Sequence, residues 1–314
     1  MSSFERGNFE KELEFCTNLY PGFSEIEGII SAFYKAREKF AEENAEVINS
    51  AHISLEEKEV KQKLKQGEPL YPQVIVRKDL MQDFFEAVAG EISKQNDNLL
   101  KEELEEFKEQ FLAEAFPASK KSFYFTPEKV SSLLQLPPDS SMDSDLGTFI
   151  ITFVLSSLYQ YLLEDVPREI DTELWQQGCC PVCGSSPHFG MLKDEGARYL
   201  ECWLCATRWW FPRLQCPYCN NTDHDKMGYF TLKSEKQETK VQKLVEGICH
   251  INFCKACNSY IKVFDARACE SEDMLLTLHN LATLSHDILA RKEGFLPGSH
   301  LYWICNEELQ QLAN

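Results

Sequence analysis

The sequence predicts an α+β protein, in which an N-terminal all-helical domain is followed by two small four-cysteine metal modules and a C-terminal helix. Two observations support this prediction. Apolar residues recur at helical spacing through the first half of the 314-residue chain. Eleven of the 13 cysteines lie between Cys179 and Cys269, and eight of these form four CxxC pairs. The expected units are a helical domain at 1–167, a first module at 168–214, a second module at 215–270, and a helix and tail at 271–314.

Charge changes at the same boundary. The chain has 32 Lys+Arg and 50 Asp+Glu, a formal net charge of -18. Residues 1–167 hold 17 of the basic and 31 of the acidic residues, whereas residues 168–270 hold 13 of each. An acidic surface does not neutralise phosphates or coat anionic lipid. We therefore expect neither nucleic acid nor a membrane among the partners.

The first half contains a series of predicted helices. The turn at Tyr20–Gly22 precedes one or two helices over Phe23–Ser50, and the charged residues 52–70 are predicted as a solvated connection. Further helices are predicted over Asp79–Gln95, from a cap at Asn98, and from an N-cap at Thr126.

The stretch from Leu146 to Leu163 has no charged residue and approaches the length of a membrane span. It contains Thr, Ser, Gln and Gly residues, and its flanks are acidic, with Asp145 on one side and Glu164 on the other. Spans favour basic and aromatic anchors at their ends. A buried core helix is therefore the favoured interpretation, with a membrane span as the alternative.

The first ten residues lack the apolar core of a signal peptide, which predicts a cytoplasmic protein. Thiols stay reduced in that compartment, so clustered cysteines indicate metal ligands more readily than disulfides. The predicted ligands are the eight paired cysteines, Cys180, Cys183, Cys202, Cys205, Cys216, Cys219, Cys254 and Cys257.

Two CxxC knuckles together make a tetrahedral, zinc-ribbon-like four-sulfur site that suits Zn or Fe. Sequential pairing, in which the first two knuckles form one site and the last two another, is favoured over a cross-brace because each unit then closes alone. The residue after the second cysteine often needs a positive φ, which Gly184, Asn220 and Asn258 tolerate. Ala206 does not, so its turn is predicted to differ. Short strands are expected at 199–202, 226–232 and 260–264.

The remaining candidates have ordinary interpretations. The unpaired cysteines are predicted to be small buried side chains; they are Cys16, Cys179, Cys249, Cys269 and Cys305. His250 is a less favoured substitute ligand, and His188 and His224 are predicted at the surface. The aromatic cluster at 203–211 has flanking arginines typical of nucleic-acid contact, but a small hydrophobic core is favoured because the segment has no net charge.

No catalytic constellation is visible. The chain lacks a phosphate loop, an HExxH and a GxSxG motif. Four thiolates at each site leave no open coordination position, unlike catalytic zinc. We therefore predict that the protein is not an enzyme. After the knuckles, Glu272–Glu293 is predicted as one helix that docks on the metal-binding half, with Gly294 as its C-cap.

The order of motifs resembles the FdhE family of formate dehydrogenase accessory proteins. The residues that carry the resemblance are Cys180–Pro187, Arg198–Cys205, Trp209, Arg213–Cys216, Cys254–Lys262 and the helix near 276–294. They cover about 165–297, and the acidic first half adds no motif.

The resemblance implies a cytoplasmic accessory protein that helps to assemble and mature a respiratory molybdenum or tungsten formate dehydrogenase by binding its catalytic subunit. It also implies rubredoxin-like modules with Fe or Zn at two four-cysteine sites, and it admits a homodimer. Two other functions stay open, a zinc-ribbon protein that binds nucleic acid and a rubredoxin-type electron carrier.

Overall fold

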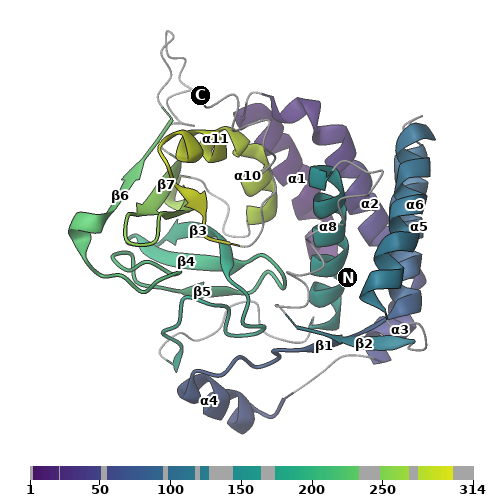
Figure 1. Ribbon diagram of the computed structural model, residues 1–314, viewed down its shortest axis with the longest axis horizontal. Coiled ribbons are helices and arrows are strands. Elements are labelled where there is room, and N and C mark those ends of the chain that lie inside the picture. Colours follow the sequence, from purple (N-terminus) through teal and green to yellow (C-terminus); the bar gives the residue numbers. More distant parts are fainter. Residues whose placement is uncertain are drawn as a thin grey trace.

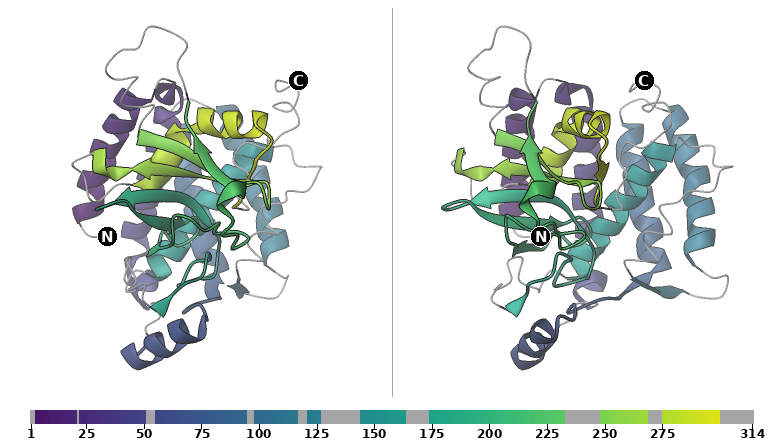
Figure 2. Two further views of the ribbon diagram at one scale, coloured as in Figure 1. Left: turned by 90° about the vertical axis from the view of Figure 1, so that its left-hand side faces the viewer. Right: turned by 60° about the vertical axis from the view of Figure 1, so that its left-hand side comes forward.

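The computed structural model combines a group of helices with a sheet (Figure 1). It describes residues 3–20, 22–50, 55–94, 98–116, 121–126, 144–163, 174–232, 248–268 and 275–299. Helices α2, α5, α6 and α8 gather on one side, and the strands of the larger sheet lie on the other with α10 and α11 beside them (Figures 1 and 2). The fold class is the mixed helical and four-cysteine arrangement that the sequence predicts.

The helices of the first half are α1 (Ser3–Leu19), η1 (Phe23–Glu25), α2 (Glu27–Glu43), α3 (Ala45–Ser50), α4 (Glu57–Gln66), α5 (Lys78–Ser93), α6 (Asn98–Ala115) and α8 (Ser144–Leu162). Helices α2, α3, α5 and α6 fall where apolar periodicity or a cap predicts them and α8 where the uncharged stretch does, but no helix was predicted at α1. Helix α4 differs, because the sequence predicted only a solvated connection there. It is a charged helix with one buried residue, Leu64, and it ends at Gly67 with a φ of 70°. The expected N-cap at Thr126 begins a segment outside the described residues.

The helical core forms where the apolar faces of α2, α5 and α8 meet. The ring of Phe40 on α2 stacks on Phe84 of α5, with centroids 4.4 Å apart. Phe153 of α8 meets Phe33 and Phe84 edge-on. Helix α8 covers most of the uncharged stretch and packs into this core, as predicted. Within the described part of the chain, no helix is long and apolar enough to cross a membrane.

Two sheets form. Strands β1 (Val74–Arg77) and β2 (Ser122–Phe125) pair antiparallel beneath the helices. The larger, seven-stranded sheet contains β3 (Pro187–Lys193), β4 (Ala197–Cys202), β5 (Arg208–Trp210), β6 (Met227–Phe230), β7 (Cys249–Cys254), β8 (Ser259–Asp265) and β9 (Leu296–Pro297). The three predicted strands correspond to β4, β6 and β8.

The order in the large sheet is β5-β4-β3-β8-β7-β6, with β9 beside β8. Strands β3 to β5 form one antiparallel ribbon, and β6 to β8 form a second. A parallel pairing of β3 with β8, from Phe189 opposite Lys262 to Leu192 opposite Asp265, joins the two ribbons. The two four-cysteine regions therefore share one sheet.

The C-terminal segment forms two helices where one was predicted. Helix α10 (Leu276–Ala282) ends at Thr283, and α11 (Leu284–Lys292) starts directly after it. The Thr283 hydroxyl donates to the carbonyl of His279 at 2.7 Å, a back-bond that suits a bend in a helix. Helix α10 packs on α1, where His279 Nε2 lies 2.9 Å from Glu12 Oε2.

Candidate metal centres

The first four-cysteine group lies where the knuckle before β3 meets the turn after β4. The sulfur of Cys180 is 3.5 Å from that of Cys205, and the sulfur of Cys183 is 3.4 Å from that of Cys202. All four are at most 1% exposed. The backbone amide of Val182 donates to the Cys180 sulfur at 3.4 Å, which favours the thiolate form.

The second group lies between the loop after β5 and the β7–β8 turn. The sulfur of Cys216 is 3.7 Å from that of Cys257, and the sulfur of Cys219 is 3.8 Å from that of Cys254. Within each group every sulfur lies within 4.8 Å of the others. The structure therefore brings the eight cysteines together in sequential, not cross-braced, order. His250 belongs to neither group.

Both groups fit a tetrahedral metal. A metal–sulfur bond of about 2.3 Å gives a sulfur–sulfur edge of about 3.8 Å. The observed 3.4 to 3.8 Å separations are close to that edge and far longer than a disulfide bond. Each group could thus hold one ion, and four sulfurs suit Zn or Fe without selecting between them.

The four knuckles share one backbone shape. The residue after the second cysteine has a positive φ in each, 81° at Gly184, 56° at Ala206, 58° at Asn220 and 54° at Asn258. The expectation that the turn at Ala206 differs is wrong. Its amide donates to the Cys202 carbonyl at 3.1 Å, as the amide of Gly184 does to Cys180 at 2.9 Å. The shape of the site overrides the local preference of alanine.

Replacing Ala206 by glycine should therefore stabilise the protein. A left-handed conformation costs a residue with a Cβ about 1 kcal/mol, and glycine avoids this cost. We expect Ala206→Gly to raise the free energy of unfolding by about 0.5–1 kcal/mol in urea titrations. Gly184→Ala is the matched reverse change and should lower it; a loss of stability in Ala206→Gly would contradict this account.

Burial distinguishes the two groups. The first belongs to the largest hydrophobic core, together with Trp203, Trp209 and Phe211, which are at most 5% exposed. This confirms the core interpretation of those aromatics. In the second group Cys216 and Cys254 are buried, but Cys257 is half-buried and Cys219 is exposed. Both groups consist of two CxxC pairs, so the spacing of the cysteines does not reveal that the two sites differ in burial.

Burial raises the pKa of the Cys180 and Cys202 thiols, whereas hydrogen bonds from neighbouring cysteines and Thr207 lower the pKa of Cys205. Metal ligation requires thiolates, so filling the first site must release protons. Acid should therefore oppose metal binding there.

The two sites meet around Tyr218, which lies between the cysteines of the third knuckle. Its hydroxyl donates to the carbonyl of Pro187 on β3 at 3.2 Å. A Cβ on Gly178, next to the first knuckle, would lie 1.8 Å from the carbonyl oxygen of Pro217. This close approach requires glycine and fixes the two knuckles against each other.

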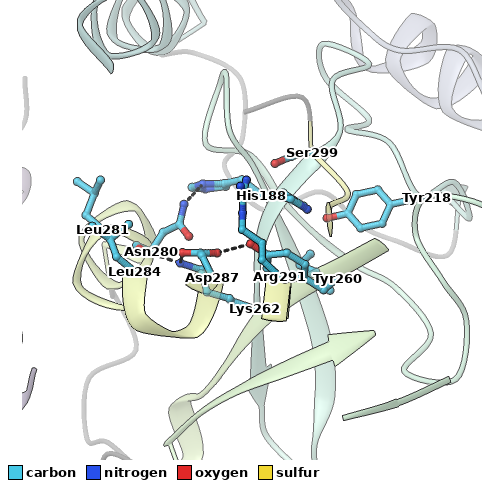
Figure 3. Close-up of a pocket in the computed structure, with 12 residues that line it drawn as sticks. His188, Tyr218, Tyr260, Lys262, Asn280, Leu281, Leu284, Asp287, Arg291 and Ser299 are labelled. Carbon is cyan, nitrogen blue, oxygen red and sulfur yellow. Dashed lines mark hydrogen bonds and ion pairs between the residues drawn. The ribbon is translucent and has the colours of Figure 1, made fainter. Parts of the chain in front are cut away.

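A small pocket beside this junction holds a buried polar network (Figure 3). Lys262 is 2% exposed, and its Nζ donates to Asp287 Oδ2 at 2.6 Å and to the Asn280 carbonyl at 2.8 Å. Tyr260 donates to the other carboxylate oxygen of Asp287 at 2.6 Å. These groups are one another's hydrogen-bond partners. The network that they form is therefore a structural link between β8 and α11.

The same network includes His188, which is predicted at the surface from its place in a loop. That prediction is wrong, since His188 is 8% exposed. Its Nε2 lies 3.2 Å from Glu201 Oε1, and its Nδ1 lies 3.1 Å from the Asn280 amide. Glu201 also accepts from Arg208 at 2.8 Å. Long-range polar partners of this kind leave no local sequence signal. His224 is exposed, as expected.

His286 on α11 should make stability depend on pH. It is 1% exposed, and burial, together with the nearby Lys262 charge, lowers its pKa to about 4. The unfolded chain, with a pKa of 6.5, takes up a proton before the folded one does. The contribution of neutral His286 to the free energy of unfolding is thus fully present above pH 6.5. It is lost as the pH falls toward 4, and the loss reaches at most about 3 kcal/mol. Urea titrations of His286→Gln should show a flatter pH dependence across this range than the native chain; equal slopes would contradict it.

The unpaired cysteines that the structure describes follow the prediction in part. Cys16 and Cys249 are fully buried, and Cys179 is half-buried. Burial raises the pKa of Cys249 to about 12, which keeps its thiol protonated. Cys269 and Cys305 lie outside the described residues.

Known proteins resemble this chain in the part that contains the four-cysteine groups. The family description "FdhE, central domain" matches residues 179–213. A protein FdhE homolog from Aquifex aeolicus is 33% identical over 173 residues, 53% of this chain and 54% of that protein. Protein FdhE of Escherichia coli K12 is 28% identical over 176 residues, 55% of this chain and 52% of that protein. This chain spans about half the length of the curated relatives that it matches.

The fold similarity is more extensive. The crystal structure of the FdhE protein from Pseudomonas aeruginosa matches with a TM-score of 0.59 and 19% identity, covering 94% of each chain. At that identity the match shows the fold alone. Because it covers 94% of the chain, the shared fold includes the helical half, in which the sequence has no family motif. The matched central domain and the shared fold thus identify the chain as similar to the FdhE proteins.

Proposed function

We propose that this chain is a cytoplasmic accessory protein for the assembly and maturation of a respiratory molybdenum or tungsten formate dehydrogenase, and that it binds the catalytic subunit. The similarity to FdhE proteins through the four-cysteine half carries this proposal. The chemistry of the sites is consistent with it. Two groups of four sulfurs have no open position for substrate, so they suit a structural or electron-carrying role better than hydrolysis.

We further propose that each group binds one metal ion through its four cysteines. In each filled site the sulfurs act as thiolates, and the knuckle amides donate to them. A bound Fe would supply redox chemistry and Zn would not. Metal analysis and a visible spectrum of anaerobically purified protein test this. We expect about two ions per chain, and a colourless protein with two Zn would exclude an electron-carrying role.

Affinity capture from the native host tests the assembly role. The tagged full-length chain would be captured from cells that oxidise formate, and retained proteins identified by mass spectrometry. Cys180→Ser and Cys254→Ser each remove one ligand, from the first and second group respectively. Cys179→Ser is the matched control, because Cys179 adjoins Cys180 but belongs to neither group.

The expected result is capture of a formate dehydrogenase catalytic subunit by the native chain and by Cys179→Ser. Loss of capture in Cys254→Ser would tie binding to the second site, and loss in Cys180→Ser alone would show that binding needs the fold that the first site maintains. Retention of nucleic acid in a salt-sensitive manner, without the catalytic subunit, would favour the zinc-ribbon alternative and contradict the proposal.

A further inference from the structure

We propose that the two four-cysteine sites have different roles. The first is a permanent structural centre, and the second exchanges its metal ion with thiol-bearing molecules, with Cys219 as the ligand that is replaced. This inference rests on the proposed metal binding and goes beyond it. Nothing in the motif spacing separates the sites, so the proposal depends on how the fold surrounds each of them.

The first site is enclosed by chain from both halves of the protein. The segment after α4 lies along the first knuckle, where the Leu70 amide donates to the Pro181 carbonyl at 2.9 Å and the Tyr71 amide to the Val182 carbonyl at 2.6 Å. Trp175 lies fully buried beside it and donates to the Cys179 carbonyl at 2.9 Å. An incoming ligand can reach these sulfurs only if this packing opens.

The second site lies outside the two larger hydrophobic clusters that the structure describes. The two strands that carry Cys254 and Cys257 do contribute to those clusters, through Ile261 and Val263 of β8 and Cys249 of β7, but the four cysteines of the second site do not. The exposed Cys219 lies in a loop after the edge of the sheet, and the Asn220 and Asn221 positions that follow it are also at or near the surface. Of the four ligand residues of this site, Cys219 is therefore the one that solvent, and an exogenous thiol in it, reaches most readily.

Exposed apolar side chains flank this opening. Leu214, two residues before Cys216, is 64% exposed, and Leu296 is 54% exposed. The Leu296 amide donates to the carbonyl of Asn258, the residue after Cys257, at 2.9 Å. The chain beside the third and fourth knuckles is therefore exposed to solvent, as Cys219 itself is.

The exchange needs no oxidant. With an ion bound, an incoming thiol would replace Cys219 as ligand, and its proton would pass to the Cys219 sulfur. One metal–sulfur bond would form and one would break, so the charge of the site would be unchanged and no electrons would be transferred. Cys216, Cys254 and Cys257 would hold the ion during this replacement.

The test uses full-length protein loaded with two zinc ions per chain. Excess chelator is added with increasing glutathione, and released zinc is followed with a colorimetric indicator. We expect one ion to leave at least about tenfold faster than the other, with a rate that rises with glutathione concentration. Pulse labelling with isotopically light and heavy N-ethylmaleimide should modify Cys219 before Cys183 or Cys205.

Two variants sharpen the result. Cys219→Ser should retain one slowly released zinc and lose the fast phase, whereas Cys179→Ser should keep both phases. Equal release rates, earlier labelling of the first-site cysteines, a rate independent of glutathione, or a fast phase that survives Cys219→Ser would each overturn the proposal. A native chain that binds no metal would overturn the proposed metal binding as well, while two equally inert ions would overturn only this inference.

Discussion

Removing one ligand of the first site should unfold much of the protein, whereas removing one ligand of the second should not. Cys183→Ala leaves an incomplete site inside the core that also holds α2, α5 and α8. A structural zinc site contributes about 10–16 kcal/mol in small domains, which is as large as the total stability of a typical protein. We therefore expect Cys183→Ala to lose cooperative unfolding and most of its metal.

Cys219→Ala is the matched change at the exposed site. Its effects should stay within β6, β7 and β8, because no large core depends on that sulfur. Hydrogen exchange followed by mass spectrometry distinguishes the outcomes. Amides of α8 should lose protection in Cys183→Ala and keep it in Cys219→Ala. Equal protection of α8 in both variants would mean that the first site does not hold the two halves together.

Replacing Lys262 by methionine should cost about 3–5 kcal/mol, since it leaves a mostly buried carboxylate without its cation. The Lys262 side chain is 3% exposed and that of Asp287 is 17% exposed. The Asn280 carbonyl would lose its donor as well. Chemical denaturation of Lys262→Met measures the loss, and Lys262→Met with Asp287→Leu should recover a large part of it.

A surface pair provides the control. Lys226 lies 3.4 Å from Asp223, and the two side chains are 55% and 47% exposed. Water and salt screen such a pair, so Lys226→Met should cost at most about 1 kcal/mol. If the two lysine variants were equally stable, the network between β8 and α11 would not be a structural link.

The features predicted correctly from the sequence are those with a local signal. Apolar periodicity marks α2, α5 and α6, the uncharged stretch marks α8, and the spacing of the CxxC pairs marks the eight clustered sulfurs. Features set by distant residues were not predicted. His188 is buried by Glu201 and Asn280, which lie 13 and 92 residues away. Helix α4 was missed because its charged sequence has almost no apolar face to reveal it.

The backbone at Ala206 was mispredicted for a related reason. Local preference disfavours a positive φ at alanine, but closing four sulfurs into one group requires it. The difference in exposure between the two sites likewise depends on the segment at 70–71 and on the joined sheet, neither of which is close to the cysteines in sequence.

The contact between α1 and α10 has a consequence for synthesis on the ribosome. Glu12 and His279, which meet in the folded protein, are 267 residues apart in the chain. At translation rates of 5–20 residues per second, roughly 13 to 53 s pass between their appearances. During that interval the residues of α1 that pack on α10 have no native partner there. The contact between the two helices therefore forms only after nearly all of the chain has been synthesised.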